Sequence, residues 1–283
     1  MNYDNNAFEE IVEIDSLVNM IKMAYAFENW EQVLTLSDSI LTSSMQIYNG
    51  LSRRKKTKRH ISYYFGYSYL MKGLAFLKLK KYSNSIECIS FYSNLTWLDD
   101  SSEESAKIIA DFKLFAEANM LTIDILMGKT EKILEYVKFL QRNPDQVLTG
   151  LLTLLESAIL YSYNIDKHIE LLTPNIQVSN LYVDQVIASK YLAFLYLLSV
   201  YQYLNKSYFS AVENALHNLT ESDKLKNDNS FKKSVTLFEF LKTKASDSQL
   251  EEYSRILKSI FKGEIVNEEN LGIGSRFSSY NIH

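Results

Sequence analysis

The sequence predicts an all-α protein, and three observations lead to that prediction. The 283 residues include only 8 glycines and 2 prolines, which is too few for the closely spaced turns of a β-sandwich or barrel. Hydrophobic residues make up 47% of the chain and charged residues 23%, as is typical of a globular protein with a large core. Apolar residues also recur at helical spacing from the start, at Ile11, Ile14, Leu17, Val18 and Ile21.

Signals for helix starts divide the chain into helical hairpins. Three of these signals are capping boxes, in which a short polar residue precedes a Glu by three positions. The three pairs are Asn6–Glu9, Ser101–Glu104 and Ser248–Glu251. Pro144 suits the first turn of a helix, where its missing N–H costs little. The predicted hairpins are 5–27 with 30–48, 60–79 with 82–93, 101–127 with 130–141, 146–162 with 166–172, 179–204 with 207–219, and 229–243 with 248–262.

The hairpins recur at a period of about 40 residues, which is typical of a helical solenoid. An aromatic residue opens the second helix of three hairpins, at Trp30, Tyr82 and Tyr208, whereas Thr130 takes that place in the third hairpin. Small residues stand where paired helices would touch. These are Gly73 and Ser85 in the second hairpin, and Ser199, Ala211 and Ala215 in the fifth.

This pattern resembles a divergent tetratricopeptide-like array. We expect a right-handed solenoid of about six helix pairs, because each hairpin has too much apolar surface to be stable without its neighbours. The pairs would form a single domain over 1–262 with a concave groove. The segment 263–283 has Gly, Ser and Asn with weak periodicity, which predicts a mobile or loosely docked tail.

Charge and targeting features indicate a cytoplasmic protein. The formal net charge of -4 differs from the strongly basic balance of dedicated nucleic-acid binders. The one cysteine, Cys88, excludes an internal disulfide and favours a reducing compartment. The acidic N-terminus MNYDNNAFEE lacks the features of a secretion signal. The longest apolar stretch, 191–204, is too short for a membrane span and predicts a buried helix.

The sequence contains no motif that indicates catalysis, so we expect neither an enzyme nor a cofactor. The histidines do not form HExxH, the single cysteine excludes a cysteine-rich zinc site, and no P-loop occurs. Cys88 is expected to be a buried structural residue. The acidic cluster Asp99–Asp100 with Glu103–Glu104 suits the N-terminus of a helix better than a metal site. The fragment GIGSR, 272–276, follows no strand and does not predict a phosphate-binding loop.

A basic run precedes the second hairpin. Three interpretations remain open: a solvated linker, which we favour, a contact for an acidic partner protein, or a sequence-independent contact with phosphates. No helix-turn-helix stands beside the run. The run consists of Arg53, Arg54, Lys55, Lys56, Lys58 and Arg59.

The tyrosines after this run lie in a segment with a recognisable resemblance. The stretch YYFGYSYLMKGLAFLKLKKYSNSIECISFYSNLTW (63–97) is similar to the tetratricopeptide-like C-terminal region of Cro/C1-type helix-turn-helix regulators from Firmicutes. The similarity continues through 112–128 and 139–158. It implies a regulatory sensor or interaction domain of the peptide-responsive group. Members carry an N-terminal DNA-binding domain, whereas this chain starts with its first hairpin, so we do not expect direct nucleic-acid binding.

In arrays of this kind, the first helix of each hairpin lines the concave groove. The resemblance therefore implies a site for a peptide or a segment of a partner protein. Asn119 can donate to and accept from a peptide backbone, although Phe115 and Tyr196 also suit packing between helices. The predicted groove residues are Tyr67, Phe115, Asn119, Tyr196 and Tyr203.

Two other functions remain open. Some peptide-responsive repeat proteins are phosphatase-like modulators of response regulators, and such a protein needs a glutamine presented by an N-terminal bundle. Gln32 and Gln46 are the only glutamines before residue 141, and neither has a distinctive setting. The chain could also be a plain scaffold that forms a homodimer and needs no ligand.

Overall fold

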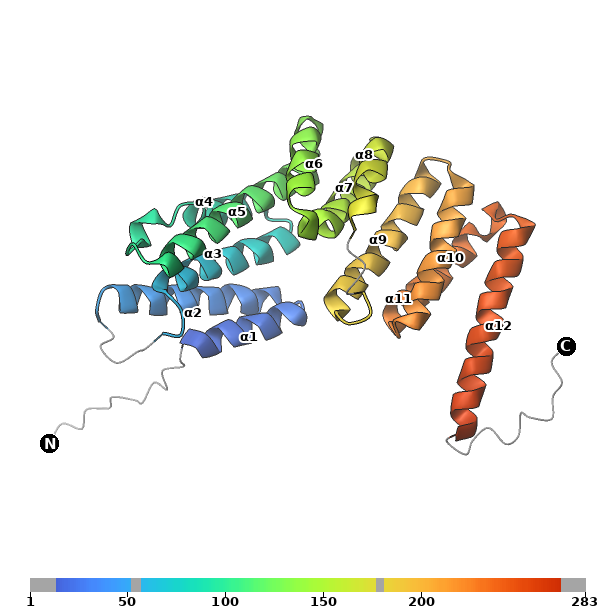
Figure 1. Ribbon diagram of the computed structural model, residues 1–283, viewed down its shortest axis with the longest axis horizontal. Coiled ribbons are helices and arrows are strands. Elements are labelled where there is room, and N and C mark those ends of the chain that lie inside the picture. Colours follow the sequence, from blue (N-terminus) through green and yellow to red (C-terminus); the bar gives the residue numbers. More distant parts are fainter. Residues whose placement is uncertain (1–13, 52–56, 177–180, 271–283) are drawn as a thin grey trace. The chain divides into compact units, whose positions relative to one another are not determined.

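The structure, a computed structural model, describes residues 14–51, 57–176 and 181–270, with side chains to 262. Within these residues all regular structure is helical, which confirms the all-α prediction (Figure 1). The helices are α1 (Ile14–Ala26), α2 (Trp30–Tyr48), α3 (Ile61–Lys78), α4 (Tyr82–Tyr92), α5 (Glu103–Leu126), α6 (Ile133–Arg142), α7 (Val147–Tyr161), α8 (Asp166–Leu172), α9 (Gln185–Leu204), α10 (Tyr208–Lys224), α11 (Asp228–Leu241) and α12 (Asp247–Asn270).

Most predicted boundaries agree with the observed helices to within three residues. However, α9 begins at Gln185, six residues after its predicted start, and α10 ends at Lys224, five residues after its predicted end. The last helix, α12, continues to Asn270 instead of ending near 262. The pair Asn6–Glu9 and the segment 271–283 lie outside the described residues. No helix in the described part of the chain is long and apolar enough to cross a membrane.

Two of the predicted capping boxes are wrong in register. At the start of α5 the N–H of Ser105 donates to the hydroxyl of Ser102 over 3.1 Å, so Ser102 caps the helix in place of Ser101. At the start of α12 the reciprocal pair is Ser246 with Gln249, at 3.3 and 3.1 Å. In both cases a neighbouring serine makes the cap, because several polar residues in a row satisfy the same sequence pattern.

The same tight turn joins several of the helix pairs. In the α3–α4 turn, the N–H of Lys81 donates to the carbonyl of Phe76 over 2.8 Å, and the N–H of Lys80 donates to the carbonyl of Leu77 over 2.9 Å. This pair of bonds is a Schellman motif, with the left-handed residue Lys80 ending the helix. Left-handed residues stand two positions before the next helical segment at Glu28 (φ 55°), Lys80 (φ 57°), Ser101 (φ 66°), Gly128 (φ 79°), Lys206 (φ 63°) and Lys226 (φ 51°).

Small residues bring the two helices of a hairpin together, as predicted. The Ser85 hydroxyl on α4 donates to the Gly73 carbonyl on α3 over 2.8 Å. The Ser199 hydroxyl on α9 donates to the Ala211 carbonyl on α10 over 2.6 Å. Both serines are buried, so each bond satisfies a hydroxyl that has no access to water.

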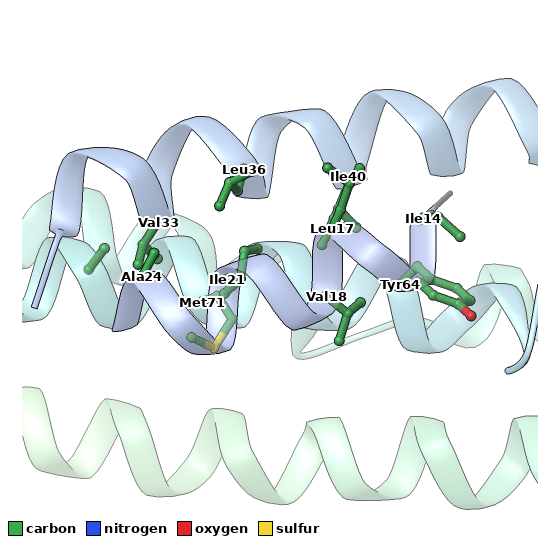
Figure 2. Packing of buried hydrophobic residues seen from close by; sticks show 11 residues of the cluster. Ile14, Leu17, Val18, Ile21, Ala24, Val33, Leu36, Ile40, Tyr64 and Met71 are labelled. Atoms are coloured by element: carbon green, nitrogen blue, oxygen red, sulfur yellow. The ribbon is translucent and has the colours of Figure 1, made fainter. Parts of the chain in front are cut away.

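The chain divides into two compact units, 1–124 and 125–283. In the first unit, α1 and α2 pack on α3 through a buried apolar cluster that includes Val18, Ile21, Ile40 and Tyr64 (Figure 2). A second cluster of this unit, centred on Phe65 and Phe112, joins α3, α4 and α5. One buried cluster of the second unit lies among α10, α11 and α12, around Leu219 and Phe238. The single domain over 1–262 stays a prediction.

Candidate partner-binding surface

The start of α3 stacks three side chains in a column. Tyr63 and Tyr67 are four positions apart and share one face of α3, and Arg59 stands four positions before Tyr63, just outside the helix. The Arg59 guanidinium carbon lies 4.2 Å from the centre of the Tyr63 ring. The Tyr63 and Tyr67 rings are stacked, with centres 5.4 Å apart and an interplanar angle of 15°. We call these three residues the aromatic column.

Helix α5 extends this surface with two phenylalanines. The Phe112 ring lies 6.5 Å from the Tyr63 ring and 5.8 Å from the Phe115 ring, between ring centres. Phe112 is buried, whereas 40% of Phe115 is exposed. Gly66 on α3 makes this approach possible, because a Cβ atom there would lie 2.4 Å from the Phe112 ring. The structure thus links two predicted residues, Tyr67 and Phe115, through contacts that continue from ring to ring.

The tyrosines of the column keep their protons. Burial raises the pKa of the Tyr63 hydroxyl, and the neighbouring Arg59 opposes this effect. Burial also raises the pKa of the Tyr67 hydroxyl, and the neighbouring Tyr63 raises it further. Both side chains are half-buried, and within the described residues neither hydroxyl makes a hydrogen bond. Each can therefore donate to a carbonyl or carboxylate of a partner.

Asn119 is partly engaged inside the first unit. Its Nδ2 donates to the hydroxyl of Tyr92 over 2.9 Å, and Tyr92 is 1% exposed. Burial raises the pKa of Tyr92. One N–H and the carbonyl oxygen of the Asn119 amide make no hydrogen bond to a described residue. Its role in holding a peptide backbone stays a prediction.

The other two predicted residues lie in the second unit. The Tyr203 ring contacts Phe240 and Tyr208, with ring centres 5.2 and 5.6 Å apart. Tyr196 is half-buried against the core of this unit. Their place in the repeat also differs. Tyr67 and Phe115 both stand fifteen positions before the next helical segment, and the corresponding residue of α9 is Ala193. Binding by Tyr196 and Tyr203 stays a prediction.

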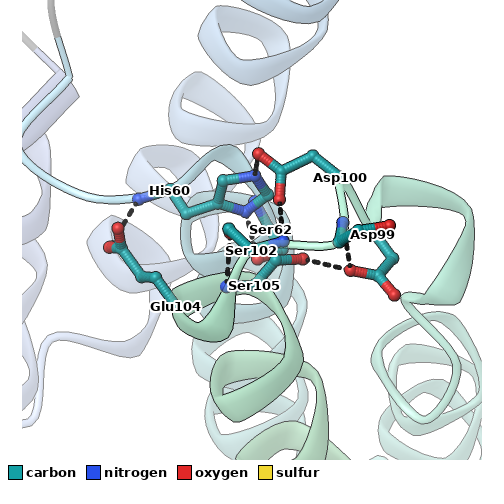
Figure 3. Close-up of polar contacts among 8 residues, drawn as sticks. His60, Ser62, Asp99, Asp100, Ser102, Glu104 and Ser105 are labelled. Carbon is teal, nitrogen blue, oxygen red and sulfur yellow. Dashed lines mark hydrogen bonds and ion pairs between the residues drawn. The ribbon is translucent and has the colours of Figure 1, made fainter.

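The last residues of the basic run lie against the aromatic column. Arg53, Arg54, Lys55 and Lys56 are outside the described residues, whereas Lys58 and Arg59 are described and exposed. Next to them, His60 caps α3: its Nδ1 accepts from the N–H of Ser62 over 3.3 Å and lies 2.8 Å from the Ser62 hydroxyl (Figure 3). The other ring nitrogen, Nε2, lies 3.3 Å from Asp100 (Figure 3).

Ser62, His60 and Asp100 resemble a nucleophile, a base and an orienting acid, but their setting does not suit catalysis. Ser62 is fully buried, so its hydroxyl cannot meet a substrate. Nδ1 accepts the Ser62 N–H, which places the imidazole proton on Nε2 facing Asp100. Hydrogen bonds from Ser102 and the nearby His60 lower the pKa of Asp100. The arrangement therefore stabilises the start of α3.

Cys88 and the acidic cluster at the start of α5 lie in surroundings that favour structural roles. Cys88 is buried, and burial raises the pKa of its thiol to about 11, so the thiol is protonated at neutral pH. Asp99 accepts from the Ser105 hydroxyl over 3.0 Å, close to the start of α5. Within the described residues, no group of three His, Cys, Asp or Glu side chains could hold a metal ion.

A cleft of about 380 Å³ lies between α10 and α12. Gln249 on its wall is 2% exposed and donates to Glu213 over 2.8 Å and to the Phe209 carbonyl over 3.1 Å. His217 and Glu252 also line it. The polar groups of Gln249 are thus satisfied by the protein itself, and the cleft contains none of the predicted site residues.

The chain matches no family model, no curated protein and no solved structure at a significant level. The assignment of the surface therefore depends on its own geometry. Tyr67 and Phe115 stay predicted site residues. The structure adds Arg59 and Tyr63 to Tyr67, and it adds Phe112 as the ring between Tyr63 and Phe115; sequence analysis placed none of these three in the groove. The spacing of four between Arg59, Tyr63 and Tyr67 was the available signal.

Proposed function

We propose that the chain is a non-catalytic regulatory protein of transcription or signalling that binds a peptide or a segment of a partner protein. The binding site would be the surface formed by the aromatic column and Phe115. One observation carries the proposal: Arg59, Tyr63 and Tyr67 stack on one another at the start of α3, and the buried Phe112 ring connects Tyr63 to the partly exposed Phe115 of the next first helix, α5. Tyrosine and arginine are the residues most often found at the centre of protein interfaces.

The recurring turn supports a tetratricopeptide-like repeat. Left-handed residues stand two positions before Trp30, Tyr82, Thr130 and Tyr208, the four positions that align the repeat in the sequence, and also before the starts of α5 and α11, at Ser101 and Lys226. A chain that repeats one supersecondary unit presents equivalent positions of successive first helices side by side. Tyr67 and Phe115 are such equivalent positions, which favours an extended partner that contacts both. We propose a cytoplasmic protein that needs no cofactor for this binding.

The alternatives receive less support from the side chains. Gln32 accepts from Asn29 over 3.3 Å, and its N–H donates to Asn29 over 3.2 Å, within the cap of α2. It therefore has a local structural role and does not add support to a phosphatase-like function. A homodimeric scaffold would show a stable dimer by light scattering, with a dissociation constant that no peptide changes.

A displayed library of random dodecapeptides, selected on the full chain, tests the proposal. We expect recurring sequences whose synthetic forms bind in fluorescence anisotropy. Tyr67→Ala and Phe115→Ala should each weaken binding roughly tenfold, the loss of a well-packed aromatic contact of about 1.4 kcal/mol. Tyr161→Ala, at an exposed tyrosine of α7, is the matched control and should bind like the wild type. A library that yields no binder would contradict the proposal.

A further inference from the structure

The segment that carries Arg59 is fixed by three different helices. Its successive backbone N–H groups each donate to a side chain. The N–H of Lys58 donates to Asp15 of α1 over 3.3 Å, and that of Arg59 donates to the Tyr64 hydroxyl of α3 over 3.2 Å. The N–H of His60 donates to Glu104 of α5 over 3.1 Å (Figure 3). The backbone at Arg59 therefore has a defined position relative to all three helices.

The two carboxylates nearest this segment are already engaged. Asp15 accepts the Lys58 N–H and, over 2.7 Å, the hydroxyl of Tyr64. Glu104 accepts the N–H of His60. Within the described residues, the Arg59 guanidinium makes no ion pair, and it lies over the face of the Tyr63 ring. Stacking on a ring leaves the N–H donors at the edge of a guanidinium available, in the geometry that matches a carboxylate.

The described side chains around this segment carry both signs of charge. Lys58 and Arg59 are basic, whereas Asp15 and Glu104 accept from backbone N–H groups of the segment, and Asp100 lies 3.3 Å from the His60 ring. Because Asp15 and Glu104 bind the backbone, the Arg59 guanidinium keeps its donors for a carboxylate of a partner. The apolar rings of Tyr63, Tyr67 and Phe115 continue from the cationic end. The surface therefore combines a prepositioned cation with neighbouring apolar contact area.

We propose that the aromatic column binds an acidic side chain of the partner segment, with a large apolar side chain a few residues away. The Asp or Glu carboxylate accepts from the Arg59 guanidinium, and the apolar side chain packs on Tyr67 and Phe115. This inference rests on the proposed function and names the chemistry of its partner. It also assigns the end of the basic run to an acidic protein segment. A solvated linker, the alternative interpretation of this run, would not require a guanidinium held in a defined position.

The test uses peptides selected from the dodecapeptide library on the full chain. They are synthesised with acetylated and amidated ends, so that a side-chain carboxylate is their only acid. We expect the selected sequences to contain Asp or Glu near an aromatic residue or Leu. Arg59→Gln should weaken binding roughly tenfold or more, as for the loss of a charge-assisted hydrogen bond. Lys78→Gln, the same charge change at an exposed position of α3, should leave affinity within about twofold.

A double-mutant cycle decides between a direct pair and general attraction. Replacing the peptide's Asp by Asn should weaken binding to the wild type as much as Arg59→Gln does, with little further loss when both changes are combined. Circular dichroism of Arg59→Gln should match the wild type, because the side chain is exposed. Selected peptides that lack acids, or that bind Arg59→Gln like the wild type, would overturn this inference and leave the proposed function intact. A library without binders would overturn both.

Discussion

The α3–α4 and α9–α10 hairpins share one design with two different surfaces. In both, a small residue stands nine positions before the aromatic that opens the second helix, and another stands three positions after it. In both, a buried serine donates across the pair, but Ser85 lies on the second helix and Ser199 on the first. The close approach of the helices thus depends on small residues at these two places, and either helix can supply the hydroxyl.

The outward faces of the same two hairpins differ. The positions of Arg59, Tyr63 and Tyr67 in α3 correspond to Gln185, Ser189 and Ala193 in α9. All three residues of α9 are exposed, and none has an aromatic ring or a charge. The two hairpins therefore share a framework, but only the first carries aromatic rings and a cation at these three positions.

The largest stability effect is expected at Gly66, which corresponds to the buried Leu192 of α9. Gly66→Ala should lower the free energy of unfolding by about 1–2 kcal/mol. The added methyl displaces the Phe112 ring, an overpacking cost of about 1–3 kcal/mol, and better helix propensity offsets about 0.5–1 kcal/mol. Urea denaturation followed by circular dichroism measures the difference.

Gly150→Ala is the matched control for this change. A Cβ atom there would lie 2.4 Å from the terminal methyl groups of Leu140, which can rotate away more easily than a packed ring. Its loss should be smaller than that of Gly66→Ala. Adding Phe112→Leu to Gly66→Ala should cost less than the sum of the two single changes. Strict additivity would show that the ring and the glycine do not constrain each other.

The second prediction concerns the serine hydrogen bond between paired helices, which is donated by the second helix in α3–α4 and by the first helix in α9–α10. Ser85→Ala and Ser199→Ala should each destabilise the protein by about 1 kcal/mol, the net value of a buried hydrogen bond. If the two arrangements are interchangeable, Ser199→Ala combined with Ala211→Ser should recover at least half of the loss, because the new hydroxyl can donate back across the pair. Thermal unfolding of the three variants measures this, and a double variant less stable than Ser199→Ala would sink the idea.

The smallest effect is expected at the shared turn. Lys80 and Lys206 have positive φ angles, 57° and 63°, at positions where glycine has no steric cost. Lys80→Gly and Lys206→Gly should each raise stability by about 0.5–1 kcal/mol. Lys81→Gly is the control, because its φ is -89°, and it should not stabilise. Stabilisation at only one of the two turns would mean that they are not equivalent.

The sequence predicts the helices well because the signals that specify each hairpin are local. Apolar spacing, the aromatics Trp30, Tyr82 and Tyr208, and the scarcity of glycine and proline all act within a few residues of the element that they specify. The errors are local too: Ser102 and Ser246 replaced Ser101 and Ser248 as caps, since neighbouring serines are equivalent at this level. The extension of α12 to Asn270 has no such signal, because the apolar periodicity fades before the helix ends.

The candidate surface was only partly predictable. Tyr67 and Phe115, which stand at the same position of their hairpins, were predicted as binding residues and stay predictions. The position of Arg59 depends on hydrogen bonds from the backbone N–H groups of residues 58–60 to side chains of three helices. Two of the accepting side chains, Asp15 and Glu104, lie more than 40 positions away in the sequence. Such long-range contacts leave no pattern in one sequence. Tyr196 and Tyr203 occupy other positions of the hairpin than Tyr67 and Phe115, and their binding role stays a prediction.

The central claim is that the partner binds the aromatic surface of the first unit and not the corresponding face of the second. Hydrogen exchange of the full chain, with and without a library-selected peptide, tests it most directly. The account predicts slower exchange in α3 and α5 on adding the peptide, with unchanged exchange in α9 and α10, and no such protection in Tyr67→Ala. Protection confined to α9 and α10, with α3 and α5 unchanged, would contradict it.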